Sequence, residues 1–132
     1  MNDALILDTN AVIGLLGGNM EIARIMVRYN RIIISAITCG EMDAGTQGTT
    51  QREQAAKAAF DELLSMPTVF VSPVSRRTGA FYATVYCFLK TRGTPIPTND
   101  MWIAATALET GSVLCTGDNH LLSLPLIRTL KV

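Results

Sequence analysis

Short apolar runs alternate with segments of helical periodicity along nearly the whole chain, and this alternation limits the fold more than any other feature of the sequence. An apolar run followed by an amphipathic helix, repeated several times, is typical of parallel strands joined by helical crossovers. We therefore predict an α/β fold, with three α/β/α layers built on a parallel sheet of four to five strands. The strands are expected at 4–7, 31–34, 68–71 and 112–115, with a further one near 126–130, and the helices at 9–16, 19–30, 35–45, 51–66, 75–91 and 100–110.

Capping signals mark two of the expected helix starts. Ser35 or Thr38 is expected to begin the helix after the second strand, and Thr38 and Glu41 have the spacing of a capping box. Thr98 or Asn99 is expected to cap the helix that begins with Asp100.

The length of 132 residues favours a single domain over 1–132, because a chain of this size buries one core. Hydrophobic residues make up 48% of the chain, which excludes a disordered protein. No apolar run reaches the roughly 18 residues that cross a bilayer, and the first residues lack the pattern of a signal peptide. The sequence therefore predicts a cytoplasmic protein with no membrane partner.

Charge and cysteine content narrow the classes of function. The formal net charge is zero, so contact with nucleic acid must come from a local feature of the surface. Charged residues make up 17%, below the typical figure of about 25%, which favours an apolar surface that meets a partner. The cysteines Cys39, Cys87 and Cys115 stand singly, without the paired spacing of a zinc site, and we interpret them as reduced core residues.

Four acidic residues are expected to meet at one edge of the predicted sheet. Asp8 directly follows the first strand, and Asp118 follows the fourth after a short turn. Glu41 lies early in the helix after the second strand, and Asp100 opens a helix whose N-terminus returns to the same edge. Because the carboxyl ends of parallel strands and the helix N-termini share that edge, these side chains should lie close together.

Taken singly, each acid has a plainer explanation. Asp8 and Asp118 could shape turns, Asp100 is favoured by the helix dipole, and Glu41 could close a capping box. If all four acids meet at one edge, a metal site becomes the better explanation, because clustered carboxylates repel one another unless a cation compensates. No Lys or Arg adjoins any of the four in the sequence. Oxygen ligands suit Mg²⁺ or Mn²⁺, which can polarise a phosphodiester. Hydrolysis of RNA follows as a hypothesis, with these four acids as metal-binding and catalytic residues.

Four segments carry residues in a recognisable order and spacing: LDTN at 7–10, SAITCGE at 35–41, NDMWIAATA at 99–107 and CTGD at 115–118. Together they resemble the PIN domain and, within it, the VapC-type toxins of bacterial toxin–antitoxin pairs. Each segment is a weak signal alone. The four of them in the family's order, spread over nearly the whole chain, make a specific one.

The resemblance implies a parallel sheet flanked by helices and an endoribonuclease site that depends on Mg²⁺ or Mn²⁺. It also implies a homodimer and inhibition by a small antitoxin protein. By the same match, Asp8 and Asp100 would be the principal metal ligands, and Glu41 and Asp118 would complete the acidic pocket.

Two polar residues look like supporting members of this site, since Thr116 and Asn10 match positions that orient Asp8 in the family. The chain departs from the family where many relatives carry an acidic residue and then Phe, because 119–121 reads NHL here. A fifth acid is therefore absent. The single histidine, His120, has no activated serine beside it, and we interpret it as a turn or surface residue.

Aromatic and basic residues could contact RNA. The rings could stack on bases, but their helical spacing favours a place in the core. The basic side chains could touch phosphates, although a solvated helix end explains them equally well. The rings are Phe81, Tyr82, Tyr86, Phe88 and Trp102, and the basic residues are Arg76, Arg77, Lys90 and Arg92.

Two other classes of function compete with the nuclease. An aspartyl-phosphate phosphatase also places its nucleophile after the first strand, but it begins with Asp-x-Asp, and here Asp8 is followed by Thr9 and Asn10. A non-catalytic PIN-like module that only docks a partner fits the low charge content, whereas the complete acidic set argues against it.

Overall fold

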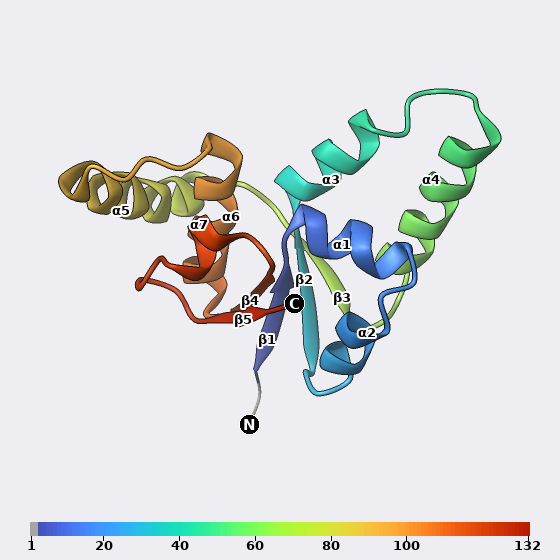
Figure 1. Ribbon diagram of the computed structural model, residues 1–132, viewed down its shortest axis with the longest axis horizontal. Coiled ribbons are helices and arrows are strands. Elements are labelled where there is room, and N and C mark those ends of the chain that lie inside the picture. The colour runs from blue at the N-terminus through green and yellow to red at the C-terminus, as the bar shows by residue number, and fades with distance from the viewer. Residues whose placement is uncertain (1–2) are drawn as a thin grey trace.

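The computed structural model describes residues 3–132, and its elements follow the alternation of the sequence (Figure 1). Within these residues, five strands form one sheet in which every neighbouring pair is parallel. The strand order is β3-β2-β1-β4-β5. The predicted α/β class and parallel sheet are confirmed. The strands are β1 (Ala4–Leu7), β2 (Arg31–Ser35), β3 (Val69–Ser72), β4 (Val113–Thr116) and β5 (Thr129–Lys131).

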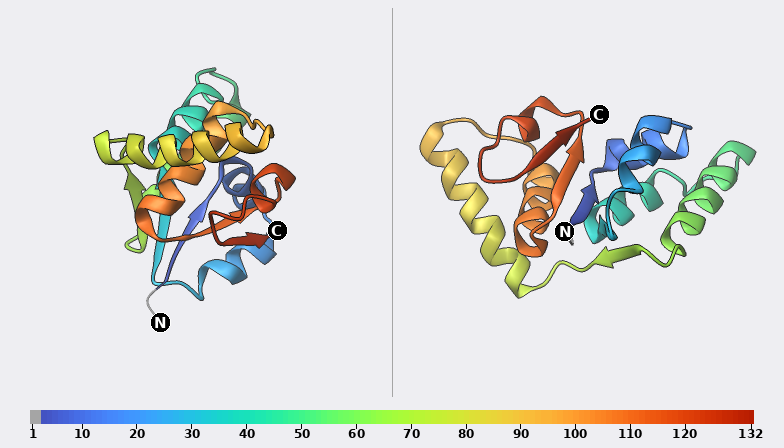
Figure 2. Two further views of the ribbon diagram at one scale, coloured as in Figure 1. Left: turned by 90° about the vertical axis from the view of Figure 1, so that its left-hand side faces the viewer. Right: turned by 90° about the horizontal axis from the view of Figure 1, so that it is seen from below.

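Helices cover both faces of the sheet, which makes the three predicted layers. The first four helices along the chain pack on one face, and the later ones pack on the other (Figures 1 and 2). The first group is α1 (Thr9–Leu16), α2 (Met20–Met26), α3 (Ala36–Ala44) and α4 (Gln51–Leu64), and the second is α5 (Arg76–Arg92), α6 (Thr98–Thr110) and α7 (Asn119–Leu122).

The central strand β1 is apolar throughout because helices cover both of its faces. Side chains alternate between the two faces of a strand, so Leu5 and Leu7 enter the core under α1 to α4, while Ala4 and Ile6 enter the core under α5 to α7. All of them are buried. A strand covered on both faces has no solvent side, and a polar residue first becomes acceptable where the strand ends.

The start of α3 differs from the prediction. Ser35 caps this helix, because its hydroxyl accepts the backbone N–H of Ile37. Thr38 is therefore an interior residue of the helix and is buried. The expected capping box of Thr38 and Glu41 is wrong, and Glu41 is available for a contact outside its own helix.

Other boundaries also differ from the sequence-based expectation. The helix expected from Asp100 begins earlier, at Thr98, after Pro97, which has no side chain that can accept a capping hydrogen bond. A cap at Thr98 or Asn99 is therefore wrong. The short helix α7 was not expected, and the last strand covers 129–131 and not 126–130.

The aromatic residues of α5 lie at the margin of the core and not inside it, which corrects the prediction in part. Tyr82 and Phe88 are half-buried and pack against the core. Val85 and Leu89 are the buried apolar side chains of this helix, while Tyr86 is 45% exposed. The reason is that α5 is the outermost helix on its side and packs mainly against α6 (Figure 2). The rings of Tyr82 and Trp102 instead stack on each other at this helix pair, with centroids 4.2 Å apart.

The cysteines are free, as predicted, but they occupy different environments. Cys115 is buried in the core, Cys39 is half-buried, and Cys87 lies exposed on α5, so the core assignment of Cys87 is wrong. In the part of the chain that the structure describes, no helix is long and apolar enough to span a bilayer.

Candidate active site

Asp8 lies at the carboxyl end of the central strand and is almost completely buried, with 4% of its surface exposed. Its position is set by the turn from β1 into α1, where it is the N-cap residue. The carboxylate oxygen Oδ1 accepts the backbone N–H of Ala11 over 2.8 Å. The cap therefore fixes the side chain at the sheet edge and gives it one strong donor.

Thr116 connects Asp8 with Asp118. Thr116 is the last residue of β4. Its hydroxyl donates to Oδ2 of Asp8 and accepts the backbone N–H of Asp118 over 3.0 Å. Asp118 in turn caps α7, with Oδ1 accepting the backbone N–H of His120 over 2.8 Å. Since β1 and β4 are neighbours in the sheet, this buried hydroxyl holds two acids of the predicted set in register.

Glu41 reaches the same edge from α3 through a residue that the sequence did not indicate. The hydroxyl of Thr9 donates to Oε1 of Glu41 over 2.6 Å and lies 3.1 Å from the hydroxyl of Thr38. Because Thr9 follows Asp8 directly, the bond draws Glu41 toward the buried carboxylate. A threonine at the first position of a helix carries no sequence signal for such a long-range contact, so this residue could not be found beforehand.

The electrostatics show that the four acids act on one another. Burial raises the pKa of Asp8, against the hydrogen bonds from Thr116 and Ala11, and the charges of Asp118 and Glu41 raise it further. Burial also raises the pKa of Asp100 to about 6, together with the negative charges of Asp118, Asp8 and Glu41. The structure thus brings Asp8, Glu41, Asp100 and Asp118 together at the carboxyl edge.

No basic side chain neutralises this cluster. Among the described residues, none of the four carboxylates forms an ion pair with a lysine or arginine. The imidazole of His120 is largely exposed, and its Nδ1 lies 3.4 Å from Oδ1 of Asp118. His120 is the surface residue that the sequence predicted.

Asn10 differs from the other residues named by the resemblance. It is exposed on α1, and within residues 3–132 no hydrogen bond joins its side chain to Asp8. Thr116 makes the contact that was expected of both residues.

The donor set fits a hard divalent cation. The four acids offer carboxylate oxygens, which are hard ligands. The thiol of Cys115 stays protonated, because burial, with the charges of Asp8 and Glu21, raises its pKa to about 12. The described side chains hold no three acidic, histidine or cysteine groups that already converge on one point. Mg²⁺ does not need such a cage, because one or two carboxylates, waters and a substrate phosphate complete its octahedron.

Comparison with known proteins agrees with the fold. A family model described as the PIN domain matches residues 5–125. The chain belongs to the PIN domain family. The curated protein Ribonuclease VapC1 of Haemophilus influenzae is 33% identical over 114 residues, which is 83% of each chain, so the match extends to the VapC type.

Solved structures of VapBC proteins have the same fold as this PIN domain. VapBC-1 from nontypeable Haemophilus influenzae aligns with a TM-score of 0.80 at 28% identity, over 97% of each chain. VapBC-5 of Mycobacterium tuberculosis, described as a member of the VapBC family of toxin–antitoxin systems, aligns with a TM-score of 0.76 at 22% identity, over 98% of each chain.

Proposed function

We propose that this PIN domain is an endoribonuclease, the toxin of a toxin–antitoxin pair, which hydrolyses RNA phosphodiesters in the cytoplasm with Mg²⁺ or Mn²⁺ at Asp8, Glu41, Asp100 and Asp118. The observation that carries the proposal is a cluster of carboxylates without basic partners, in which the pKa of Asp100 rises to about 6. Such a cluster is unfavourable for the empty protein and becomes favourable when a divalent cation binds.

A bound divalent ion would polarise the phosphodiester, lower the pKa of an attacking water and stabilise the leaving oxygen. The protein's part is to position the carboxylates. Asp8 is held by donors on both oxygens, which leaves each oxygen one further lone pair for a cation. Asp100 would bind in its ionised form, so a bound cation would lower its pKa from about 6.

A cleavage assay with matched variants tests the proposal. A structured RNA is incubated with purified protein and Mg²⁺ or Mn²⁺, beside a chelator control, with Asp8→Asn as the site variant. Asparagine keeps an acceptor that can cap α1, so this variant should fold. Asp61→Asn is the control, because Asp61 lies exposed on α4 beside Lys57.

The expected result is metal-dependent cleavage that Asp8→Asn loses and Asp61→Asn keeps. Equal cleavage by Asp8→Asn would exclude the assigned site. A folded wild type that binds partners but cleaves no RNA with either metal would favour the non-catalytic module in its place.

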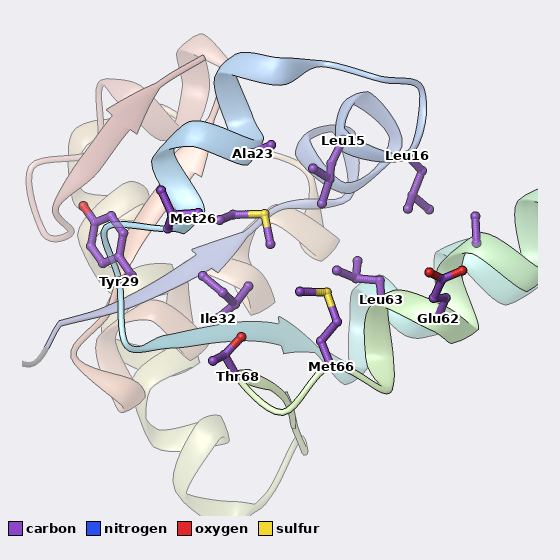
Figure 3. Close-up of a pocket in the computed structure, with 12 residues that line it drawn as sticks. Leu15, Leu16, Ala23, Met26, Tyr29, Ile32, Glu62, Leu63, Met66 and Thr68 are labelled. Carbon is purple, nitrogen blue, oxygen red and sulfur yellow. The ribbon is translucent and has the colours of Figure 1, made fainter.

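An antitoxin has a suitable docking place on the face of α1, α2 and α4. An apolar groove of about 670 Å³ lies between these helices and β2, with Leu16, Met26 and Leu63 among its walls (Figure 3). Leu16 also lines a second hollow that reaches Thr9 and Glu41. We propose that the antitoxin lays apolar side chains in the groove and brings a basic residue through the second hollow to the acidic cluster, because the groove is apolar and the clustered carboxylates lack a basic partner.

Glutamate substitutions at exposed positions of the groove test this docking. Val27 is 84% exposed and Met66 is 43% exposed, so Val27→Glu and Met66→Glu should fold. If a small open reading frame adjoins the gene, both variants should fail to retain its product on co-expression, and both should retain RNA cleavage. Tyr86→Glu, on the opposite face, should keep the complex. Retention of the complex by both groove variants would place the antitoxin elsewhere.

We also propose a homodimer that covers the exposed apolar side chains near the edge strand β3. These are Phe70, Val71 and Val74, which are 50%, 47% and 40% exposed. Sedimentation at micromolar concentration should show a dimer for the wild type and a monomer for Phe70→Glu. A dimer that survives this substitution would place the interface elsewhere, and a wild-type monomer would remove it.

A further inference from the structure

A small hollow lies beside the acidic cluster, where the C-terminal end of α5, the connection 93–97 and α7 meet. Its volume is about 240 Å³, and its lining includes Phe88, Arg92, Ile96, His120 and Leu124. This is below the roughly 300–1,000 Å³ of pockets that take whole drug-sized ligands, so it suits a single ring system.

Two of the residues that line the hollow are close to acids of the cluster. His120 belongs to the first turn of α7, whose cap is Asp118, and its Nδ1 lies 3.4 Å from Oδ1 of that carboxylate. Ile96 also lines the hollow, and it stands four positions before Asp100, which is in the first turn of α6. A group seated in the hollow is therefore next to whatever occupies the carboxylates.

The chemistry of the walls fits a base with an adjoining phosphate. Phe88, Ile96 and Leu124 offer apolar contact to the faces of a ring. His120 and Arg92 carry planar groups that stack on nucleobases, and Arg92 lies over the ring of Phe88, 5.1 Å from its centroid. The guanidinium also supplies a positive charge near a cluster that otherwise repels RNA.

The segment 93–97 makes this wall stiff. Pro95 and Pro97 fix the backbone φ angles there, and Gly93 ends α5 with a φ of 67°. A wall that is formed before RNA arrives loses little entropy on binding, which favours a defined subsite over an adaptable loop.

We propose that this hollow binds one unstacked nucleobase of a single-stranded RNA segment next to the phosphate at the carboxylates, with His120 stacking on the base and Arg92 contacting the adjoining phosphate. The assignment of the neighbouring phosphate rests on the proposed nuclease function, whereas the binding of a base does not. His120 is then a specificity-determining residue.

Binding of abasic oligoribonucleotides tests this subsite. A fluorescein-labelled single-stranded RNA of ten nucleotides is made as a series in which each position in turn lacks its base. The parent protein is Asp8→Asn, which leaves the RNA intact. Fluorescence anisotropy with Mg²⁺ then gives the Kd for this parent and for the parent with His120→Ala or Arg92→Gln added. Arg24→Gln, an exposed arginine on α2, is the matched control for lost charge.

We expect that removal of one particular base weakens binding to the protein with an intact His120 by about 10-fold, which is the contribution of one stacked base. The same removal should change the affinity of His120→Ala less than 2-fold. Arg92→Gln should weaken binding to every oligonucleotide of the series similarly, and Arg24→Gln should leave all affinities unchanged.

The inference is overturned if the abasic series affects His120→Ala as much as the parent, or if no position of the series stands out. A parallel cleavage assay with Asp8 restored separates this result from the proposed function. Cleavage by the wild type without base-dependent binding would refute only the subsite. Base-dependent binding through His120 without cleavage would support the subsite and refute the nuclease.

Discussion

Asp100→Asn should stabilise the metal-free protein while it removes the activity. In the folded chain, burial and the charges of Asp118, Asp8 and Glu41 raise the pKa of Asp100 from 3.8 to about 6. The folded state therefore binds this proton more tightly than the unfolded state does. The resulting penalty is absent below about pH 4, grows as the pH rises and is complete above about pH 6. Asparagine has no charge to repel its neighbours at any pH.

The size of the effect follows from the change in pKa. A rise from 3.8 to about 6 corresponds to about 3 kcal/mol in a site without solvent. Asp100 is only half-buried, and screening by water reduces the expected gain to about 1–2 kcal/mol. For a chain of this length, each kcal/mol raises the Tm by about 3–5 °C, so Asp100→Asn should melt about 3–10 °C above the wild type at pH 7.5.

Thermal unfolding followed by circular dichroism, in a chelating buffer at pH 7.5 and at pH 4, measures the difference. The gain should shrink toward zero at pH 4, where the wild-type carboxyl is protonated. Millimolar Mg²⁺ should then raise the Tm of the wild type at pH 7.5 more than that of the variant. The reasoning is refuted if Asp100→Asn melts below the wild type at pH 7.5, or if its advantage is the same at both pH values.

Three further substitutions test other parts of the structure. Thr116→Val removes the buried hydroxyl that donates to Asp8, so the Mg²⁺ affinity measured by isothermal titration calorimetry should fall about 10-fold or more. An unchanged affinity would show that Thr116 does not position Asp8. Phe60→Ala truncates a core side chain of α4 that is 2% exposed and should lower the free energy of unfolding in urea by about 3–5 kcal/mol, and a loss below about 1 kcal/mol would contradict its packing role. Gly111→Ala places a side chain at a φ of 63° after α6 and should lower the free energy of unfolding in urea by about 1–2 kcal/mol. An unchanged free energy of unfolding would contradict this expectation.

Much of the acidic site could be predicted because its positions follow from strand ends. Asp8 and Asp118 stand just after apolar runs, and in a parallel sheet such positions share one edge. The supporting contacts were harder to foresee. Thr9 and Glu41 are 32 positions apart, and Thr116 and Asp8 are 108 apart, so neither hydrogen bond leaves a local trace in the sequence.

Burial in α5 and the start of α3 do not follow the local patterns of the sequence. Phe81 and Phe88 have the helical spacing of a core stripe, yet the outer position of α5 leaves both only half-buried. The Thr38 and Glu41 pair has capping-box spacing, but Ser35 already caps the helix. A pattern over a few residues cannot report which side of a helix meets the rest of the chain.

The amino-acid sequence by itself determined the parallel α/β architecture and the position of Asp8 and Asp118 just after strand ends, because apolar periodicity and turn residues act over a few neighbouring positions. Only the tertiary structure decided the protonation of Asp100, the hydrogen bonds that hold Asp8 and Glu41, and the hollow next to His120. Desolvation and charge repulsion depend on which distant segments share one place in the folded molecule, and that proximity exists only after the sheet and its helices have assembled.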